Sequence, residues 1–191
     1  IEAQAIGGGG GTGGDVENKA IVGIGGSGKN AGHSGTVTVS NGAVIATQGD
    51  GAQGILAQSI GGGGGTGGSV EQATIAIGGG TLTSVLEQIN AAKLLGIDAF
   101  ANATGGHGDT VTVNNSVNGH IVTKGNKASA ILTQSIGGGG GVGGDASGTI
   151  SIGSFGSAAG DGKGVTVDNQ GTLETHGKNS SALVAQSIGG G

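Results

Sequence analysis

The sequence predicts an all-β chain folded as a repetitive β-solenoid (a parallel β-helix) with glycine-rich tracts and one inserted amphipathic helix. Two observations carry this prediction: a tripeptide motif that recurs with a run of glycines after it, and short stretches in which apolar residues alternate with polar ones. The motif is Gln-Ser-Ile, once with Ala in place of Ser, at Gln4-Ala5-Ile6, Gln58-Ser59-Ile60, Gln134-Ser135-Ile136 and Gln186-Ser187-Ile188. Such repetition is typical of one supersecondary unit stacked on copies of itself.

The glutamines set the period. The steps are 54 residues from Gln4 to Gln58, 76 from Gln58 to Gln134 and 52 from Gln134 to Gln186. We therefore expect one segment, 1–191, with units at about 4–57, 58–133 and 134–185 and a partial unit at 186–191. Because it starts and stops inside a repeat, we expect it to be part of a longer protein. The stretch from the first Val of a unit to the Ile of Gln-Ser-Ile suits a three-sided coil, which leaves one or two coils per unit open.

Within each unit the apolar positions alternate with a period of two, as in strands with one buried face. A Val-x-Val pair is followed by Asn, then by an aliphatic-x-Thr-x-Gly stretch, Gln-Ser-Ile and a further aliphatic pair. The first complete series of this kind begins at Val37, Asn41, Ile45, Gln58 and Ile75. We expect the aliphatic side chains to form internal rows and the Thr and Asn side chains to form hydrogen-bonded ladders. Each Asn is expected at a tight corner, where it tolerates positive φ.

The glycine tracts at 7–14, 61–68 and 137–144 have three interpretations. They are flexible loops, segments where backbones approach closely, or phosphate cradles. The third rests on residues 23–30, which match G-x-x-x-x-G-K but end in Asn30 where magnesium binding needs Ser or Thr. No helix pattern follows this match, so we do not predict nucleotide binding.

The second unit carries about 22–24 extra residues near 81–102, where glycine almost disappears. Leu82, Val85, Leu86, Ile89 and Lys93 recur at steps of three and four, which predicts an amphipathic helix. Its apolar face must be covered, either by the flank of the stack or by a partner.

Composition excludes several functions. The net charge is −5 and the chain contains no Arg, Trp or Tyr, which argues against nucleic acid and against an aromatic sugar cleft. Absent Cys excludes a disulfide framework and most structural zinc sites. No two of the four His share a metal-binding spacing, and the Asp residues beside turns are not in a serial calcium repeat. We therefore predict no enzyme activity, cofactor, metal or small-molecule substrate.

The run Val-Thr-Val-x-Asn to Gln-Ser-Ile-Gly-Gly-Gly-Gly-Gly, clearest in residues 36–65 and varied in 110–141 and 164–191, resembles the repeated passenger region of large bacterial autotransporters. The resemblance implies a β-helical stalk outside a Gram-negative cell, anchored to the outer membrane by a C-terminal barrel that lies beyond these residues. Such passengers are commonly adhesins or biofilm factors.

The sequence thus favours an extracellular structural or adhesive segment that acts by repeated weak contacts along a stiff stalk. Expected partners are host or surface glycans, matrix proteins or other copies of the chain. The alternatives are a self-associating spacer and, less favoured, a polysaccharide-cleaving β-helix. The contact residues we expect are outward rows and the insertion, namely Asn41, Thr47, Asn115, Thr123, Asn169, Thr175, Leu86, Ile89 and Lys93.

Overall fold

The computed structural model describes residues 1–17, 21–78, 103–153 and 156–191, and these residues form thirteen strands and no helix. The strands are β1 (Glu2–Ile6), β2 (Val22–Ile24), β3 (Val37–Asn41), β4 (Val44–Thr47), β5 (Ile55–Ile60), β6 (Val70–Ile77), β7 (Val111–Asn115), β8 (His120–Thr123), β9 (Ile131–Ile136), β10 (Ala146–Ile152), β11 (Val165–Asn169), β12 (Thr172–Thr175) and β13 (Leu183–Ile188). The prediction of an all-β chain is confirmed for these ranges. The expected helix, with Leu86, Ile89 and Lys93, lies outside the described residues.

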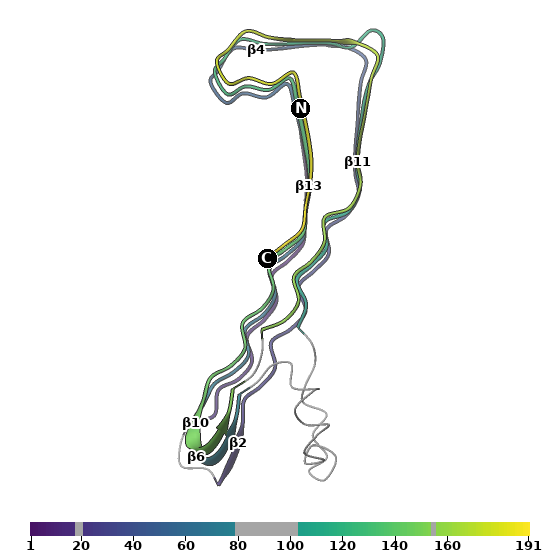
Figure 1. The fold of residues 1–191 in the computed structure, drawn as a ribbon. Coiled ribbons are helices and arrows are strands. Elements are labelled where there is room, and N and C mark those ends of the chain that lie inside the picture. Colours follow the sequence, from purple (N-terminus) through teal and green to yellow (C-terminus); the bar gives the residue numbers. More distant parts are fainter. Residues whose placement is uncertain (18–20, 79–102, 154–155) are drawn as a thin grey trace.

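The strands form four parallel sheets in which each strand pairs with its equivalents in neighbouring units. The sheet orders are β1-β5-β9-β13, β2-β6-β10, β3-β7-β11 and β4-β8-β12. Gln4 lies opposite Gln58, Gln58 opposite Gln134 and Gln134 opposite Gln186. One unit therefore forms one layer, which settles the question of one or two coils. Successive layers overlie one another, as in a β-helix-like fold (Figure 1).

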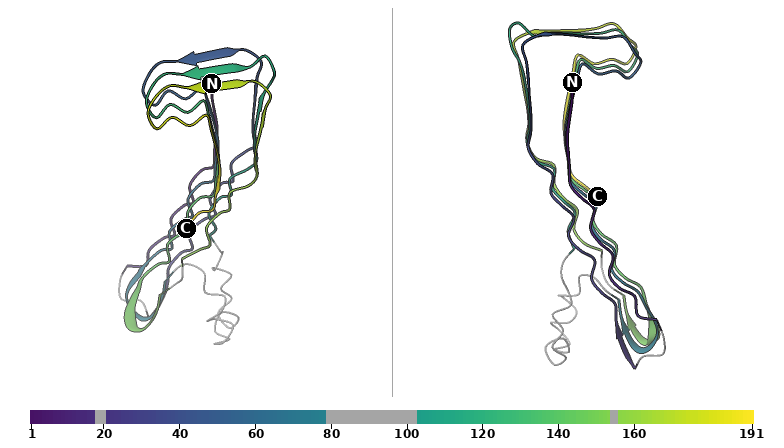
Figure 2. Two further views of the ribbon diagram at one scale, coloured as in Figure 1. Left: turned by 45° about the horizontal axis from the view of Figure 1, so that its top comes forward. Right: turned by 180° about the vertical axis from the view of Figure 1, so that it is seen from behind.

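Each layer has a wider frame and a narrow arm (Figures 1 and 2). In the frame, the β1-β5-β9-β13 sheet faces the β3-β7-β11 sheet and the β4-β8-β12 sheet closes the end. Apolar side chains from these sheets fill the space between them, led by the fully buried Ile55, Ile121 and Ile131. The expected internal aliphatic rows are present. A smaller cluster of Val70, Ala73 and Ala76 lies at the tip of the arm.

The arm consists of two extended glycine-rich segments that run in opposite directions, residues 7–14 and 25–35 in the first layer. Every third amide in the outgoing segment donates to the next layer: Gly7, Gly10 and Gly13 donate to the carbonyls of Ile60, Gly63 and Thr66. Every third amide in the returning segment donates across the arm: Gly26, Lys29 and Gly32 donate to Gly14, Gly11 and Gly8. This three-residue period is that of a polyproline II helix, which has no internal hydrogen bonds and must find partners outside itself.

A continuous zigzag of backbone hydrogen bonds connects the two segments of the arm through all layers. It runs through Gly190, Gly160, Gly138, Gly106, Gly62, Gly32 and Gly8, in that order. The amide of each residue before Gly8 donates to the carbonyl of the residue named after it. A Cβ on Gly62 would overlap the carbonyl of Gly8, and one on Gly138 would overlap that of Gly62. Among the described glycines only Gly51 has a left-handed φ. The tracts therefore need glycine for close backbone approach, and the interpretation as ordered packing is confirmed.

The corner after β3, β7 and β11 is held by an internal ladder of asparagines. Asn41 Nδ2 donates to Asn115 Oδ1 at 2.8 Å, and Asn115 Nδ2 donates to Asn169 Oδ1 at 2.7 Å. The ladder is as expected, but the expectation that these side chains face outward is wrong. Asn41 and Asn115 are 6% and 1% exposed, and Asn169 is exposed only because no layer covers it on one side. None of the three has positive φ.

The Thr row formed by the last residues of β4, β8 and β12 also points inward, contrary to expectation. Thr123 is fully buried, and Thr47 and Thr175 are half-buried in the outer layers. Each hydroxyl donates to a carbonyl five residues later, at Ala52, Ala128 and Ser180, and not to another Thr. These bonds span a turn whose equivalent residues Gly51, Lys127 and Asn179 all have φ between 54° and 71°. The left-handed position lies here and not at the asparagine corner.

A glutamine ladder runs along the outer side of the β1-β5-β9-β13 sheet. Gln58 Nε2 donates to Gln134 Oε1, and Gln134 Nε2 donates to Gln186 Oε1, both at 2.6 Å.

We expect Gln134→Ala to lower the unfolding free energy by about 1 kcal/mol, since it removes two half-exposed hydrogen bonds between side-chain amides. The midpoint of urea unfolding, followed by circular dichroism, measures this effect. Gln48→Ala is the control, because the Gln48 side chain is exposed and makes no hydrogen bond to another described residue. An equal loss of unfolding free energy in this variant would contradict the ladder's contribution.

Thr133 lies in an otherwise apolar inner row, opposite Ala57 and Ala185. Its side chain is fully buried, and its Oγ1 has no hydrogen-bond partner among the described residues. An unsatisfied buried hydroxyl destabilises the folded state, whereas a methyl of similar shape does not. We expect Thr133→Val to raise the unfolding free energy by about 1 kcal/mol in the same urea experiment. A decrease would mean that the hydroxyl has a partner in solution.

Candidate functional site: an outer corner groove

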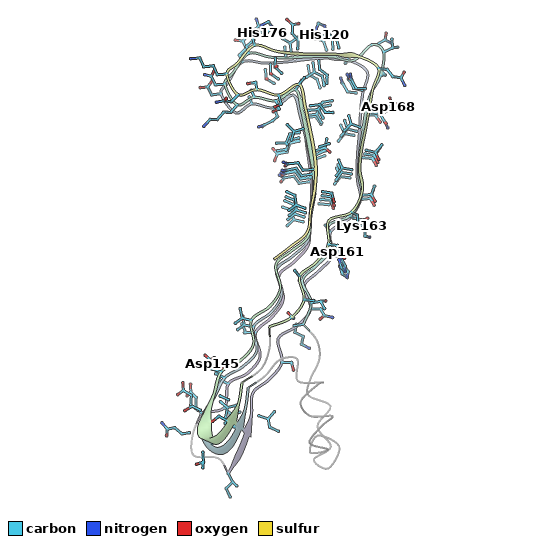
Figure 3. The ribbon with its side chains drawn as sticks, viewed as in Figure 1. His120, Asp145, Asp161, Lys163, Asp168 and His176 are labelled. Carbon is cyan, nitrogen blue, oxygen red and sulfur yellow. The ribbon has the colours of Figure 1, made fainter. Side chains whose placement is uncertain are left out.

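A hollow of about 400 Å³ lies at the corner where β3, β7 and β11 end. It is lined by residues from three consecutive layers: Ser40, Asn41, Gly42, Asn114, Asn115, Ser116, Asp168 and Gln170. We call it the outer corner groove. Figure 3 shows Asp168 on the side of β11 that faces away from the frame's interior. The volume of the groove is within the range of small-ligand sites in proteins.

The strand alternation decides which side chains reach the groove. In β3, β7 and β11 the Val and Asn positions face inward, so the residue between the second Val and the Asn faces outward. That residue is Ser40, Asn114 or Asp168, and these three are register partners. The outer face therefore carries a row of three different polar groups, one strand spacing apart.

The middle layer has a longer corner than its neighbours. Four residues separate Asn115 from His120, whereas two separate Asn41 from Val44. The extra length makes a protruding loop that carries Val117, whose exposed fraction is 72%. The loop bulges from the corner in Figure 1, and its first residue, Ser116, lines the groove.

The groove contains polar groups that the fold leaves free. Among the described residues, the side chains of Ser40, Asn114 and Ser116 have no hydrogen-bond partner, while Asp168 Oδ2 accepts from Gln170 Nε2 at 3.1 Å. By contrast, the amides of Asn41 and Asn115 are engaged in the ladder below. The floor is thus rigid and the outer row is available for a ligand.

Two histidines stack on the arm outside this groove. The rings of His33 and His107 are parallel with centroids 4.8 Å apart. His33 Nδ1 accepts the amide of His107 and His107 Nδ1 accepts the amide of Asp161, at 2.9 and 2.8 Å. These bonds link the two rings to the neighbouring layers of the stack.

A third polar cluster lies on the outer face of β8 and β12. Glu174 lies between His120 Nε2 at 3.6 Å and His176 Nε2 at 2.7 Å. Figure 3 shows both histidines on the outer side of this sheet. Over the described ranges no three His, Asp or Glu side chains are arranged to hold a metal ion. We therefore treat this cluster as contacts of the Glu174 carboxylate with two imidazole rings.

Asp109 anchors the base of β7. Its Oδ1 accepts the amide of Thr110 at 2.7 Å and contacts Lys163 Nζ at 3.3 Å. The Thr110 amide bond, with the Lys163 contact, holds the pKa of Asp109 below its ordinary value of 3.8. A lowered pKa stabilises the folded state above that ordinary value, and this stabilisation is lost as pH falls through the folded-state pKa.

We therefore expect Asp109→Asn to be less stable than the wild type at pH 7, and the difference to shrink as pH falls below 3.8. Thermal unfolding between pH 7 and pH 2.5 measures the difference. A gap that stays constant over this range would contradict the carboxylate's role. Asp168→Asn, which alters a carboxylate without a Lys neighbour among the described residues, is the control.

The sequence-predicted contact residues do not gather in the groove as an outer row. Asn41 and Asn115 reach it only from the floor, Thr47, Thr123 and Thr175 face the interior, and Asn169 belongs to the ladder. Sequence reasoning missed Ser40, Asn114 and Asp168, because their residue types differ from layer to layer. The signal that identifies them is position: each stands between an inward Val and an inward Asn.

The phosphate-cradle match at residues 23–30 belongs to the arm. Lys29 and Gly26 donate their amides to Gly11 and Gly14 across it, and a Cβ on Gly28 would meet the backbone of Gly65 and Thr66. These amides are therefore not available to a phosphate.

Comparison with protein families, curated proteins and solved structures returned no match. No helix within the described ranges is long and apolar enough to cross a membrane. The functional proposal therefore rests on the chain's own residues.

Proposed function

We propose that the chain is a β-solenoid segment of an autotransporter passenger, displayed outside a Gram-negative cell as a non-enzymatic structural and adhesive stalk. The observation that carries this proposal is the register: each layer sets equivalent residues one strand spacing above those of the layer before. A surface built this way repeats its contacts along the axis. Weak sites that repeat on one stiff body bind far more tightly together than singly.

The side-chain ladders support the stiffness that a stalk requires. Asparagine and glutamine amides each link neighbouring layers, and the glycine zigzag links the arm from Gly190 to Gly8. Because these bonds run along the stack, bending it would break several of them together. The outer row of Ser40, Asn114 and Asp168 lies on the resulting rigid edge.

A non-enzymatic role is favoured by the chemistry of the groove. Most glycoside cleavage uses a pair of carboxyl groups on either side of the scissile bond. The groove residues include one carboxylate, Asp168, and no histidine. The polysaccharide-cleaving alternative would need a second acid.

A self-associating spacer is the second candidate. It is favoured by the outer face of the β1-β5-β9-β13 sheet, where the half-buried Leu56, Leu132, Ile60 and Ile136 flank the glutamine ladder. Such a face offers apolar area to another copy of the chain.

Binding of the purified chain to immobilised glycans, to matrix proteins and to itself tests the proposal. Each target is presented to the free chain and to beads that carry many copies of it. We expect saturable binding to a foreign target that gains about 100-fold or more on beads, with no release of reducing sugar ends. Binding to itself alone would replace the proposal by the spacer, and sugar release would replace it by the enzyme.

A further inference from the structure

We propose that the outer corner groove binds a neutral, hydroxyl-rich glycan chain that lies along the stack axis. This inference rests on the adhesive function proposed above and names the partner class and the site. The groove is the hollow whose outer row is Ser40, Asn114 and Asp168, flanked by Ser116 and Gln170. Asp168 is labelled in Figure 3.

The free groups of the groove match sugar hydroxyls. A sugar hydroxyl both donates and accepts, and so do the hydroxyls of Ser40 and Ser116 and the amide of Asn114, which have no partner among the described residues. The Asp168 carboxylate accepts only, and it can hold two neighbouring hydroxyls. Hydrogen bonds to a charged acceptor are stronger than those between neutral groups.

The charge of the groove selects against anions. None of its lining residues is Lys, His or Arg, and Asp168 contributes a carboxylate. A sulfated or phosphorylated chain would bring like charge against that carboxylate without a cation to offset it. The lining therefore favours an uncharged chain.

The direction of the ligand follows from the layers. The three residues of the outer row are register partners on neighbouring strands, about 4.8 Å apart along the stack. A polymer that presents a hydroxyl set at each sugar can contact each layer in turn. Val117, 72% exposed, follows the lining residue Ser116 on the longer corner loop and offers an apolar surface for the C–H faces of a sugar next to it.

A peptide strand fits this place less well. Peptides commonly bind sheets by adding a strand at an open edge, but β7 is paired on both sides by β3 and β11. The groove exposes side chains of the sheet face and not a row of free backbone groups. A divalent cation would find one carboxylate and otherwise only neutral oxygen atoms, which makes a weak site.

The test measures binding of neutral linear oligosaccharides of two to seven sugars to the whole chain by calorimetry, with Ca²⁺ alone and sulfated oligosaccharides beside them. We expect affinity to rise with length up to about three sugars, one per layer, and then to level off. Asn114→Ala and Asp168→Asn should each weaken binding about 5- to 10-fold. Both residues are exposed, so the unfolding midpoints should match that of the wild type.

Gln48→Ala changes an exposed polar residue outside the groove lining; it is the control and should leave the affinity unchanged. Oligosaccharide binding that neither groove variant alters would overturn the groove assignment while the adhesive function stands. Preference for Ca²⁺ or for the sulfated chains would overturn the neutral-glycan assignment. If the chain binds no glycan, no matrix protein and only itself, the adhesive function fails together with this inference.

Discussion

Gly62→Ala should lower the unfolding free energy by about 3 kcal/mol. Gly62 lies in a central layer of the arm, donates its amide to Gly32 and accepts from Gly106. A Cβ there would overlap the carbonyl of Gly8. Because that carbonyl belongs to a backbone already bonded to Gly32, the layers can separate only by breaking the zigzag. The urea midpoint, followed by far-ultraviolet circular dichroism, should fall accordingly.

The neighbouring residue supplies a matched control. Gly63 is exposed, no atom lies within 4 Å of a Cβ built on it, and its φ is not left-handed. Gly63→Ala should therefore leave stability unchanged or raise it by about 0.5 kcal/mol, because Ala restricts the unfolded chain. Equal destabilisation by both substitutions would contradict close packing of the arm and would favour the flexible-loop interpretation of the tracts.

Asn115→Ala should cost about 2–4 kcal/mol. Asn115 is the central member of the internal ladder and is 1% exposed. Its removal leaves the Nδ2 of Asn41 and the Oδ1 of Asn169 without their bonds across the layer. It also leaves a void at a corner where the β7–β8 connection turns. The loss should appear as a lower urea midpoint.

Asn114→Ala is the control for this change, because the adjacent side chain is exposed and has no partner among the described residues. We expect Asn115→Ala to lose stability and Asn114→Ala to lose only ligand binding. If both variants kept the wild-type midpoint, the ladder would contribute little and the corner would be held by backbone bonds alone.

Periodicity made the architecture predictable from the sequence. Recurrence of Gln-Ser-Ile identified the repeat, and alternation in stretches such as Val37 to Asn41 identified the strands, because a buried face selects apolar residues at every second position. The same repetition indicated that equivalent residues would stack. It did not fix how many layers one unit spans, since that depends on how far the glycine arm extends before it turns back.

The direction of the polar rows was harder to predict. Asn41 follows the inward Val39 by two residues, and Thr47 follows the inward Ile45 by two residues, so strand alternation places both side chains inward. Their polar residue types nevertheless suggested an outer surface. Burial is tolerated because each group is hydrogen-bonded: Asn to its copies in adjacent layers and Thr to a turn carbonyl. The groove escaped prediction because its row, Ser40, Asn114 and Asp168, does not repeat.

The most direct test of the stacked register is disulfide formation between engineered cysteines, since the chain has none of its own. Thr38 and Thr112 are register partners on β3 and β7, and Thr112 and Thr166 are partners on β7 and β11. Adjacent parallel strands lie about 4.8 Å apart, within reach of a disulfide, whereas positions two layers apart lie about 9.6 Å apart and cannot be bridged. The account predicts efficient oxidation of Thr38→Cys with Thr112→Cys, and of Thr112→Cys with Thr166→Cys, but none of Thr38→Cys with Thr166→Cys. Failure of both neighbouring pairs, or bridging of the distant pair within one chain, would contradict one unit per layer.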